Sequence, residues 1–438
     1  MIKVTKFGGS SLADAAQFRK VAAIIRSDKS RRYVVPSAPG KRFKEDVKVT
    51  DMLYNCYNSV YMGKDAFEEL FAAIQDRFNG IIRELELELS LEREFEAIRM
   101  AFMSKCGKDY AASRGEYLNG KILAAYLGYE FVDAAEVIFF DDSGKFDGEL
   151  TNTAVADRLK DIERAVIPGF YGSMPNDTVK TFSRGGSDIT GSIVARAVQA
   201  DLYENWTDVP GFLMADPRIV KDPAVIKEIT YNELRELSYM GATVLHEDAI
   251  FPVRNSRIPI NIRDTNAPEE PGTMIVDRRV GGIPDTVITG IAGKKGFKVI
   301  NIEKDMMNTE IGFGRRVLEV LEKFHISFEH FPSGIDTVGV VVRDTELQNK
   351  EKEIITKIQE AVRPDRIVVE SEMALIAVVG DGMIRQKGTA AKIFNAIANT
   401  EVNIRMIDQG SSELNIIIGV DESDFERALD AIYHAFMK

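Results

Sequence analysis

Cysteine is almost absent from this chain, because only Cys56 and Cys106 occur among its 438 residues. Two cysteines this far apart match no zinc-site spacing and supply no disulfide framework. Runs of about 18 apolar residues are also missing, and the N-terminal residues contain no apolar signal core. We therefore expect a cytoplasmic protein that neither crosses nor binds a membrane.

Positive charge is scarce as well. The chain has 56 Lys and Arg against 68 Asp and Glu, a net charge of −12. This excess of negative charge argues against nucleic acid or an anionic membrane as the main partner. Any anion-binding site must therefore be local. The length itself predicts two or three domains with sizeable cores.

Two glycine-rich loops stand out against this background. The first is Lys6-Phe7-Gly8-Gly9-Ser10-Ser11 and the second is Phe182-Ser183-Arg184-Gly185-Gly186-Ser187-Asp188. Each follows an expected strand, precedes an expected helix and carries a basic residue. Glycines let backbone N–H groups approach phosphate oxygens, and the next helix offers its positive end. The pair therefore suggests one common anionic target.

Apolar periodicity predicts alternating strands and helices in the first half of the chain. We expect strands at 2–7, 33–35, 129–132, 165–170, 179–182 and 201–206, and helices at 12–25, 113–127, 151–160 and 187–199. This alternation favours an α/β layer fold with a largely parallel central sheet. In the segment 84–92 leucines alternate as in a strand, but its Leu and Glu content favours a helix, which we predict.

One further segment, Gly115 to Lys121, has the spacing of a P-loop. Ile122 stands where Ser or Thr should bind magnesium, and no strand precedes the first glycine. We predict that this segment is helical. A G-x-G-x-x-G dinucleotide fingerprint is absent from the sequence.

An internal repeat follows the Pro- and Gly-containing loop at 266–272. Its two copies are offset by 76 residues, as from Gly312 to Gly388, and matching positions are Gly312, Val317, Leu318, Leu321, Ile326, Gly334, Val338, Val340 and Val342 with Gly388, Ile393, Phe394, Ile397, Val402, Gly410, Leu414, Ile416 and Ile418. Each copy predicts helix, strand, turn, strand and helix, with an earlier strand at 299–302 or 375–379. This order is typical of a small ferredoxin-like α+β module, present twice.

Candidate chemistry centres on the two loops. Lys6 would meet a phosphate, whereas Asp188 is explained either by the helix dipole or by holding Lys6 in place. Of the four histidines, three lie in or near the repeats. A histidine base at the loops is therefore not expected, and phosphorylation of a carboxylate needs none, because that nucleophile is already ionised at neutral pH.

Four segments, in this order, resemble aspartokinase signatures: Lys6 to Ser11, Ser113-Arg114-Gly115-Glu116, Ser183 to Asp188 and Trp206-Thr207-Asp208-Val209. The resemblance spans the chain and implies an amino acid kinase domain of three layers at 1–280. Two ACT modules would follow at 281–370 and 371–438, with strands exchangeable between them. It implies transfer of a phosphoryl group from ATP, with Mg²⁺, to the β-carboxylate of L-aspartate, the first step towards lysine, threonine and methionine.

The resemblance also implies roles for single residues. Lys6 and Asp188 would be catalytic, and Ser37, Thr50, Glu116 and Arg184 would bind aspartate, with Glu116 on its ammonium and Arg184 on its α-carboxylate. The nucleotide would contact Lys6, Gly8, Gly9, Ser10, Thr207, Asp208, Arg218, Thr243 and Val244. Many relatives have lysine at position 243 and tyrosine at position 213, where this chain has Thr243 and Leu213. No residue is assigned to a metal.

Regulation is expected in the first module. The effector residues implied by the resemblance are Met306, Asn308, Gly312, Phe313, Ser327, Phe328, Glu329 and Asp336. Lysine is the expected effector, with its side-chain ammonium on Glu329 or Asp336, or else both acids are merely solvated. ACT-mediated homodimers or homotetramers are expected. Another amino acid kinase, or an amino acid sensor with a degenerate kinase domain, remains an alternative.

Overall fold

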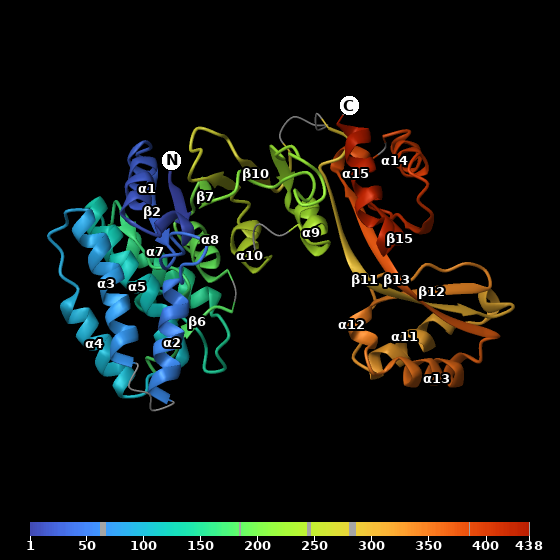
Figure 1. Cartoon of the computed structure of the whole chain (residues 1–438), viewed down its shortest axis with the longest axis horizontal. Helices are drawn as coiled ribbons and strands as arrows, with labels where there is room; N and C mark the ends of the chain where they lie inside the picture. Colours follow the sequence, from blue (N-terminus) through green and yellow to red (C-terminus); the bar gives the residue numbers. More distant parts are fainter. Residues whose placement is uncertain (62–66, 184, 243–246, 280–285, 385, 438) are drawn as a thin grey trace. The chain divides into compact units, whose positions relative to one another are not determined.

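The computed structural model describes residues 1–61, 67–183, 185–242, 247–279, 286–384 and 386–437. The chain forms two compact units. One contains Met1–Phe212, Val225–Tyr231 and Val244–Arg279, and the other contains Leu213–Ala224, Asn232–Thr243 and Val280–Lys438 (Figure 1). Among the described helices none is long and apolar enough to cross a membrane.

The first unit is built on an eight-stranded sheet in the order β3-β4-β2-β1-β7-β9-β10-β8. The strands are β1 (Lys3–Phe7), β2 (Arg31–Pro36), β3 (Glu130–Phe131), β4 (Ala165–Val166), β7 (Leu202–Thr207), β8 (Glu228–Thr230), β9 (Ile260–Asp264) and β10 (Thr273–Val276). Every neighbouring pair is parallel except β9 with β10. A hairpin of β5 (Tyr171–Ser173) and β6 (Val179–Thr181) stands apart. The prediction of a largely parallel sheet is confirmed.

Helices cover both faces of this sheet. They are α1 (Ala15–Arg26), α2 (Val49–Tyr61), α3 (Phe67–Glu84), α4 (Glu92–Met103), α5 (Lys108–Leu127), α6 (Ala134–Val137), α7 (Gly148–Leu159), α8 (Gly186–Ala197) and α10 (Glu247–Asn255). Side chains of α1 to α5 share one apolar core with Phe7 and Trp206. Because successive strand residues face opposite sides, Lys6 and Asn205 point to the other face, where α8 packs. The three layers expected for the kinase domain are present.

Most predicted elements of this unit are confirmed, and the segment 115–121 lies inside helix α5. The helix predicted at 84–92 was wrong. Helix α3 ends at Glu84, Glu86 takes a left-handed φ of 56°, and the chain runs irregularly to α4. Leu85 and Leu91 are buried in the core, and Leu87 and Leu89 pack against it. Tertiary burial of these leucines outweighs their helical propensity.

The second unit contains a five-stranded antiparallel sheet in the order β12-β11-β13-β15-β14. Its strands are β11 (Gly290–Glu303), β12 (Thr337–Arg343), β13 (Arg366–Val379), β14 (Ile404–Asp408) and β15 (Asn415–Asp421). The helices are α9 (Tyr231–Tyr239), α11 (Phe313–Lys323), α12 (Asp344–Leu347), α13 (Glu351–Val362), α14 (Thr389–Ala398) and α15 (Phe425–Phe436).

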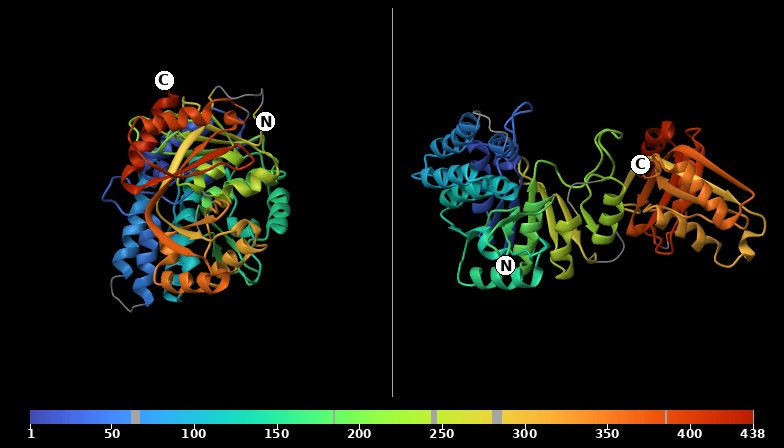
Figure 2. Two further views of the ribbon diagram at one scale, coloured as in Figure 1. Left: turned by 90° about the vertical axis from the view of Figure 1, so that its right-hand side faces the viewer. Right: turned by 90° about the horizontal axis from the view of Figure 1, so that it is seen from below.

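The repeat is visible in this unit. Gly312 and Gly388 precede α11 and α14 with left-handed φ values of 81° and 89°. The long strands β11 and β13 lie side by side and run through both copies (Figure 2). The copies differ at one predicted strand. The second copy has β14, whereas the first makes only isolated bridges at His330 and Ser333. The domain boundaries read from the sequence remain predictions.

Candidate active site

Lys6 and Asp188 meet on the α8 face of the first sheet. Lys6 Nζ lies 2.6 Å from Asp188 Oδ1, and both side chains are largely buried. Asn205, which no sequence motif marks, completes the group: its Nδ2 donates to Asp188 Oδ1 at 2.9 Å, and its Oδ1 accepts from Lys6 Nζ at 3.4 Å. Lys6 and Asn205 are register partners on β1 and β7. This pairing could not be read from residues 199 positions apart.

The first glycine loop passes close to the Lys6 ammonium at Gly8. A Cβ added at Gly8 would stand 3.7 Å from Lys6 Nζ, and a Cβ at Gly9 would stand 2.7 Å from the Ala38 carbonyl oxygen. The Gly8 N–H donates to the Trp206 carbonyl at 3.0 Å, which fixes the loop at the end of β7. Only glycine at position 9 allows the loop this close to the segment after β2.

The serines of this loop do not cap α1. Asp14 is the N-cap residue and accepts from the Gln17 N–H at 2.9 Å. Ser11 is buried and its hydroxyl lies 2.8 Å from Thr265 Oγ1. Ser10 begins a short 3₁₀ turn with its side chain half-buried. Ser10 is thus the loop serine that can still offer a hydroxyl to a phosphate.

The second glycine loop opens α8. Gly185 caps the helix with a left-handed φ of 58°, and Asp188 lies in the first turn. A Cβ at Gly186 would approach Phe170 Cδ2 to 2.5 Å, so the loop passes close to that ring. The positive end of α8 therefore points to the same place as Lys6. Arg184, the expected partner of the α-carboxylate, lies outside the described residues.

Glu116 provides a second polar group on the opposite layer. It lies on α5 with only 6% exposure, its carboxyl accepts from the Ala38 N–H, and burial raises its pKa to about 8. Its Oε2 atom is buried without a hydrogen-bond partner among the described residues. A buried acceptor of this kind calls for a donor, and an ammonium group is the donor that would restore its charge.

Ala38 links this carboxyl to the glycine loop. The Ser37 carbonyl, which shares a peptide unit with the Ala38 N–H, accepts from Asn119 Nδ2 at 2.6 Å. Two residues further on, the Gly40 N–H donates to the Gly9 carbonyl at 2.8 Å. Ser37 is half-buried beside this contact, and Thr50 lies half-buried in the first turn of α2. Of the residues expected around aspartate, Ser37, Thr50 and Glu116 thus lie in or beside the segment between β2 and α2.

The residues expected at the nucleotide do not all belong to one compact unit. Thr207 ends β7 and Asp208 follows it, exposed, at the same sheet edge as Gly8. Arg218 belongs to the second unit, where it pairs with Asp216 at 2.5 Å in an exposed turn. Thr243 and Val244 lie outside the described residues.

The site fits a magnesium-bound nucleotide. Within the described ranges, no three His, Cys, Asp or Glu side chains approach closely enough to hold a metal ion. Mg²⁺ in phosphoryl-transfer sites needs only one or two carboxylates together with the phosphates of the nucleotide. The exposed carboxylate of Asp208, whose Oδ1 accepts from Thr207 Oγ1 at 3.2 Å, is of the right chemistry to hold it.

Four of the expected effector residues, Met306, Asn308, Gly312 and Phe313, lie at or just before the start of α11. Met306 has a left-handed φ of 59°, Gly312 and Phe313 open the helix, and the Asn308 N–H donates to the Ile335 carbonyl at 3.1 Å. Asp336, Ser327 and Phe328 are exposed. The Asp336 carbonyl accepts from the Lys304 N–H just before β12, whereas the Glu329 N–H donates to Val341 near the end of that strand.

Glu329 differs from its neighbours because its carboxylate is already engaged. Its side chain is 5% exposed, its Oε1 accepts from Arg343 Nε at 2.8 Å, and its Oε2 accepts from the Tyr239 hydroxyl. Asp336 makes no such contact within the described part of the chain. Of the two acids expected to meet a lysine ammonium, Asp336 is therefore the accessible one.

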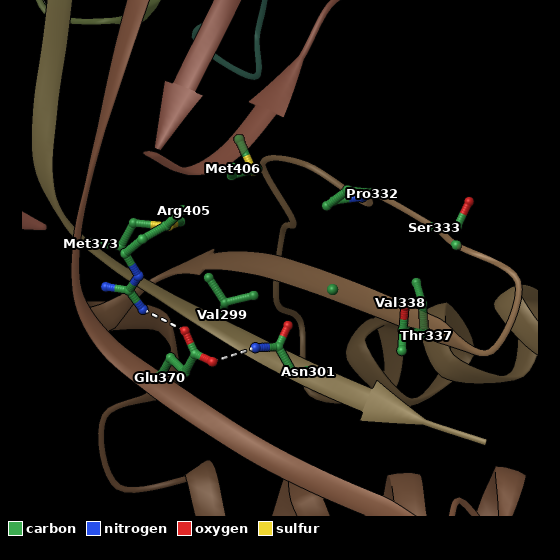
Figure 3. A pocket seen from close by; sticks show the side chains of 12 residues that line it. Val299, Asn301, Pro332, Ser333, Thr337, Val338, Glu370, Met373, Arg405 and Met406 are labelled. Carbon is green, nitrogen blue, oxygen red and sulfur yellow. Dashed lines mark hydrogen bonds and ion pairs between the residues drawn. The ribbon is translucent and has the colours of Figure 1, made fainter. Parts of the chain in front are cut away.

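A hollow of about 340 Å³ lies elsewhere on this sheet, between β11, β12, β13 and β14 (Figure 3). Arg405 crosses it to Glu370 at 2.6 Å, and Glu370 accepts from Asn301 at 2.8 Å. Arg405 also pairs with Asp421 at 2.9 Å. One arginine thus meets two carboxylates, and none of the expected effector residues lines this hollow.

The chain is similar to proteins of known family along its length. The amino acid kinase family model matches residues 1–264, and an ACT domain model matches residues 376–436. Aspartokinase 3 of Bacillus subtilis is 41% identical over 454 residues, which are 99% of this chain and 98% of that protein. The crystal structure of Clostridium acetobutylicum aspartate kinase superposes with a TM-score of 0.89 at 54% identity and covers 99% of both chains.

More distant likeness extends to E. coli aspartokinase III, whose structures cover 100% of both chains. Its complex with lysine and aspartate gives a TM-score of 0.71 at 25% identity. Its complex with aspartate and ADP gives a TM-score of 0.73 at 24% identity, a likeness of fold.

The family model spans more than half of the chain, and the chain therefore belongs to the amino acid kinase family. The 41% identity with the Bacillus protein over the full length assigns the chain to one group within this family. Within the family it is an aspartokinase, an aspartate kinase whose regulatory region contains ACT sequence. The family expected from the four sequence signatures is confirmed.

Proposed function

We propose that this protein transfers the γ-phosphoryl group of ATP to the β-carboxylate of L-aspartate, giving 4-phospho-L-aspartate and ADP. The observation that carries the proposal is the Lys6 ammonium, which Asp188 holds beside Gly8 of the first glycine loop. A fixed cation beside backbone N–H groups and a helix N-terminus suits the charge that develops during phosphoryl transfer. In biosynthesis this reaction commits aspartate to lysine, threonine and methionine.

Aspartate would bind between α5 and the segment after β2. Glu116 would accept its α-ammonium, Arg184 would pair with its α-carboxylate, and Ser37 and Thr50 would line the side-chain carboxylate. That carboxylate is ionised at neutral pH and attacks without a base. The chain's task is to bring two anions together, so Lys6, the glycine loop and the start of α8 must offset their repulsion.

ATP would be held by Lys6, Gly8, Gly9 and Ser10 at one edge of the sheet and by Thr207 and Asp208 at the end of β7. Arg218, Thr243 and Val244 complete the proposed nucleotide contacts. Mg²⁺, held by Asp208 and the phosphates, would supply neutralising charge.

We test the reaction by measuring ADP release with aspartate, glutamate and N-acetylglutamate. Aspartate alone should support turnover. Lys6→Ala should mainly lower kcat, because it removes charge stabilisation of the transition state, whereas Arg184→Ala should mainly raise KM for aspartate. A parent protein without aspartate-dependent turnover refutes the proposal and favours a sensor instead.

Regulation by an end product is the second part of the proposal. Lysine is proposed as the inhibitor, bound beside α11 with its side-chain ammonium on Asp336, because Glu329 is occupied. Calorimetric titration should show lysine binding that Asp336→Asn abolishes. Threonine binding without lysine binding would overturn the assignment.

Assembly through the ACT region is proposed as well, as a homodimer or homotetramer in the cytoplasm. The first repeat exposes Met306, Ile311 and Ile335 by 65%, 96% and 69%, which is more apolar surface than one short loop needs. Ile311→Asp should lower the mass measured by light scattering. An unchanged mass would contradict this interface.

A further inference from the structure

Asn205 is an unusual residue for its place. It lies inside strand β7 with 4% exposure, although asparagine is disfavoured in strands and a buried amide is costly unless it is hydrogen-bonded. Its side chain makes two hydrogen bonds, one to Lys6 and one to Asp188. Among the described residues the amide has no other hydrogen-bond partner, so its cost is offset only by the catalytic pair.

The two ends of the amide match the two charges. The carbonyl oxygen faces the ammonium at 3.4 Å and the N–H faces the carboxylate at 2.9 Å. A lysine ammonium has three N–H groups. Asp188 takes one and Asn205 takes a second, which leaves the third for an incoming phosphoryl oxygen.

We propose that Asn205 is a positioning residue for phosphoryl transfer, acting through Lys6 and Asp188. Its oxygen fixes the direction of the ammonium, and its N–H keeps a donor on Asp188 Oδ1 when Lys6 turns towards phosphate. This inference rests on the proposed reaction but concerns a residue for which that reaction gives no role.

A neighbouring amide offers a matched control. Asn261 lies on β9, opposite Glu204 of β7, with 5% exposure. Its Nδ2 donates to the carbonyls of Pro271 and Thr273 at 3.0 and 3.2 Å, which are structural contacts. Substitution of either asparagine by leucine removes a buried amide of the same size from the same sheet.

The kinetic test uses Asn205→Leu, Asn205→Asp and Asn261→Leu in the full chain. Both Asn205 variants should lower kcat by about tenfold to a hundredfold, with KM for aspartate changed by less than about twofold. Asn205→Asp keeps the shape but places an oxygen against Asp188 Oδ1. Asn261→Leu should lower the melting temperature and leave kcat unchanged.

The opposite results overturn the proposal. Asn205→Asp with wild-type kcat would show that the residue only fills space, and a rise in KM alone would assign it to substrate binding. A crystal structure of Asn205→Leu gives a readout that does not depend on aspartate. Lys6 Nζ should leave its position 2.6 Å from Asp188 Oδ1, and an unmoved pair refutes the inference. Failure of the proposed reaction is seen separately, as absent turnover in the wild-type protein.

Discussion

Among single residues, Glu116 couples substrate binding to pH. Burial raises its pKa to about 8, so at pH 7 the carboxyl of the free protein is mostly protonated. A substrate ammonium beside it favours the ionised form. We expect aspartate binding at pH 7 to release about one proton. Calorimetry in two buffers of different ionisation enthalpy measures this release. Glu116→Gln should release none, and equal heats in both buffers for the wild type would contradict the expectation.

The same carboxyl should make the free protein less stable as pH rises. Its folded pKa of about 8 lies above the ordinary value of 4.5, so between these values the folded state binds more protons than the unfolded state. The free energy of unfolding therefore falls as pH rises through this range. Glu116→Gln removes this pH-dependent fall in the free energy of unfolding, because glutamine does not titrate. Its melting temperature relative to wild type should increase from pH 5 to pH 8, and a constant difference would contradict the assignment.

Residue motifs predicted part of this site. Lys6, Asp188 and Glu116 stand out in the sequence because glycines or charged neighbours mark them. Asn205 has no such mark, since it is a single polar residue in a strand. Its meaning comes only from the parallel pairing of β1 with β7, which places it beside Lys6. A long-range contact of this kind cannot be derived from local patterns.

At the scale of elements, the glycine loop depends on a close backbone approach. A Cβ at Gly9 would lie 2.7 Å from the Ala38 carbonyl, whereas a Cβ at Gly80, inside α3, would meet nothing within 4 Å. Gly9→Ala should therefore cost about 1–3 kcal/mol of stability and lower kcat by displacing the loop. Gly80→Ala should add up to about 1 kcal/mol. Denaturant unfolding measures the stability of both variants, and kinetics measures their kcat. A Gly9→Ala protein that is active and fully stable would show that the close approach of Gly9 to Ala38 is not required.

Two elements show where sequence patterns fail. The leucines at 85–91 pack into or against the core from an irregular segment. Glu86, two residues after the end of α3, has a left-handed φ that stops the helix from continuing. The first repeat replaces a strand by two isolated bridges at His330 and Ser333, although the second repeat forms β14. Propensity and repeat spacing predicted where elements begin. Neither contains information on which residues tertiary packing will bury or pair.

At the scale of the whole molecule, the compact units do not follow the sequence families. The kinase family model runs to residue 264, yet the segments Leu213–Ala224 and Asn232–Thr243 belong to the unit that contains the regulatory sheet. Glu233 of α9 accepts from Thr289 Oγ1 at 2.6 Å and from the Asp381 N–H at 2.8 Å. Helix α9 is thus bonded to the residue before β11 and to the turn after β13. In the sequence, the proposed nucleotide residue Thr243 comes four residues after the end of α9.

We expect Tyr239 to couple effector binding in the regulatory region to inhibition of catalysis. Its hydroxyl bonds Glu329, which adjoins the proposed effector residues Ser327 and Phe328. Tyr239→Phe should leave uninhibited kcat unchanged but raise the inhibitor concentration for half-inhibition about fivefold or more, a coupling loss of about 1 kcal/mol. Tyr433→Phe is the matched control, because it removes a hydroxyl bond of 2.9 Å to the Ala224 N–H, away from the effector loop. It should lower the melting temperature without changing inhibition. Equal inhibition curves for wild type and Tyr239→Phe would show that α9 carries no signal.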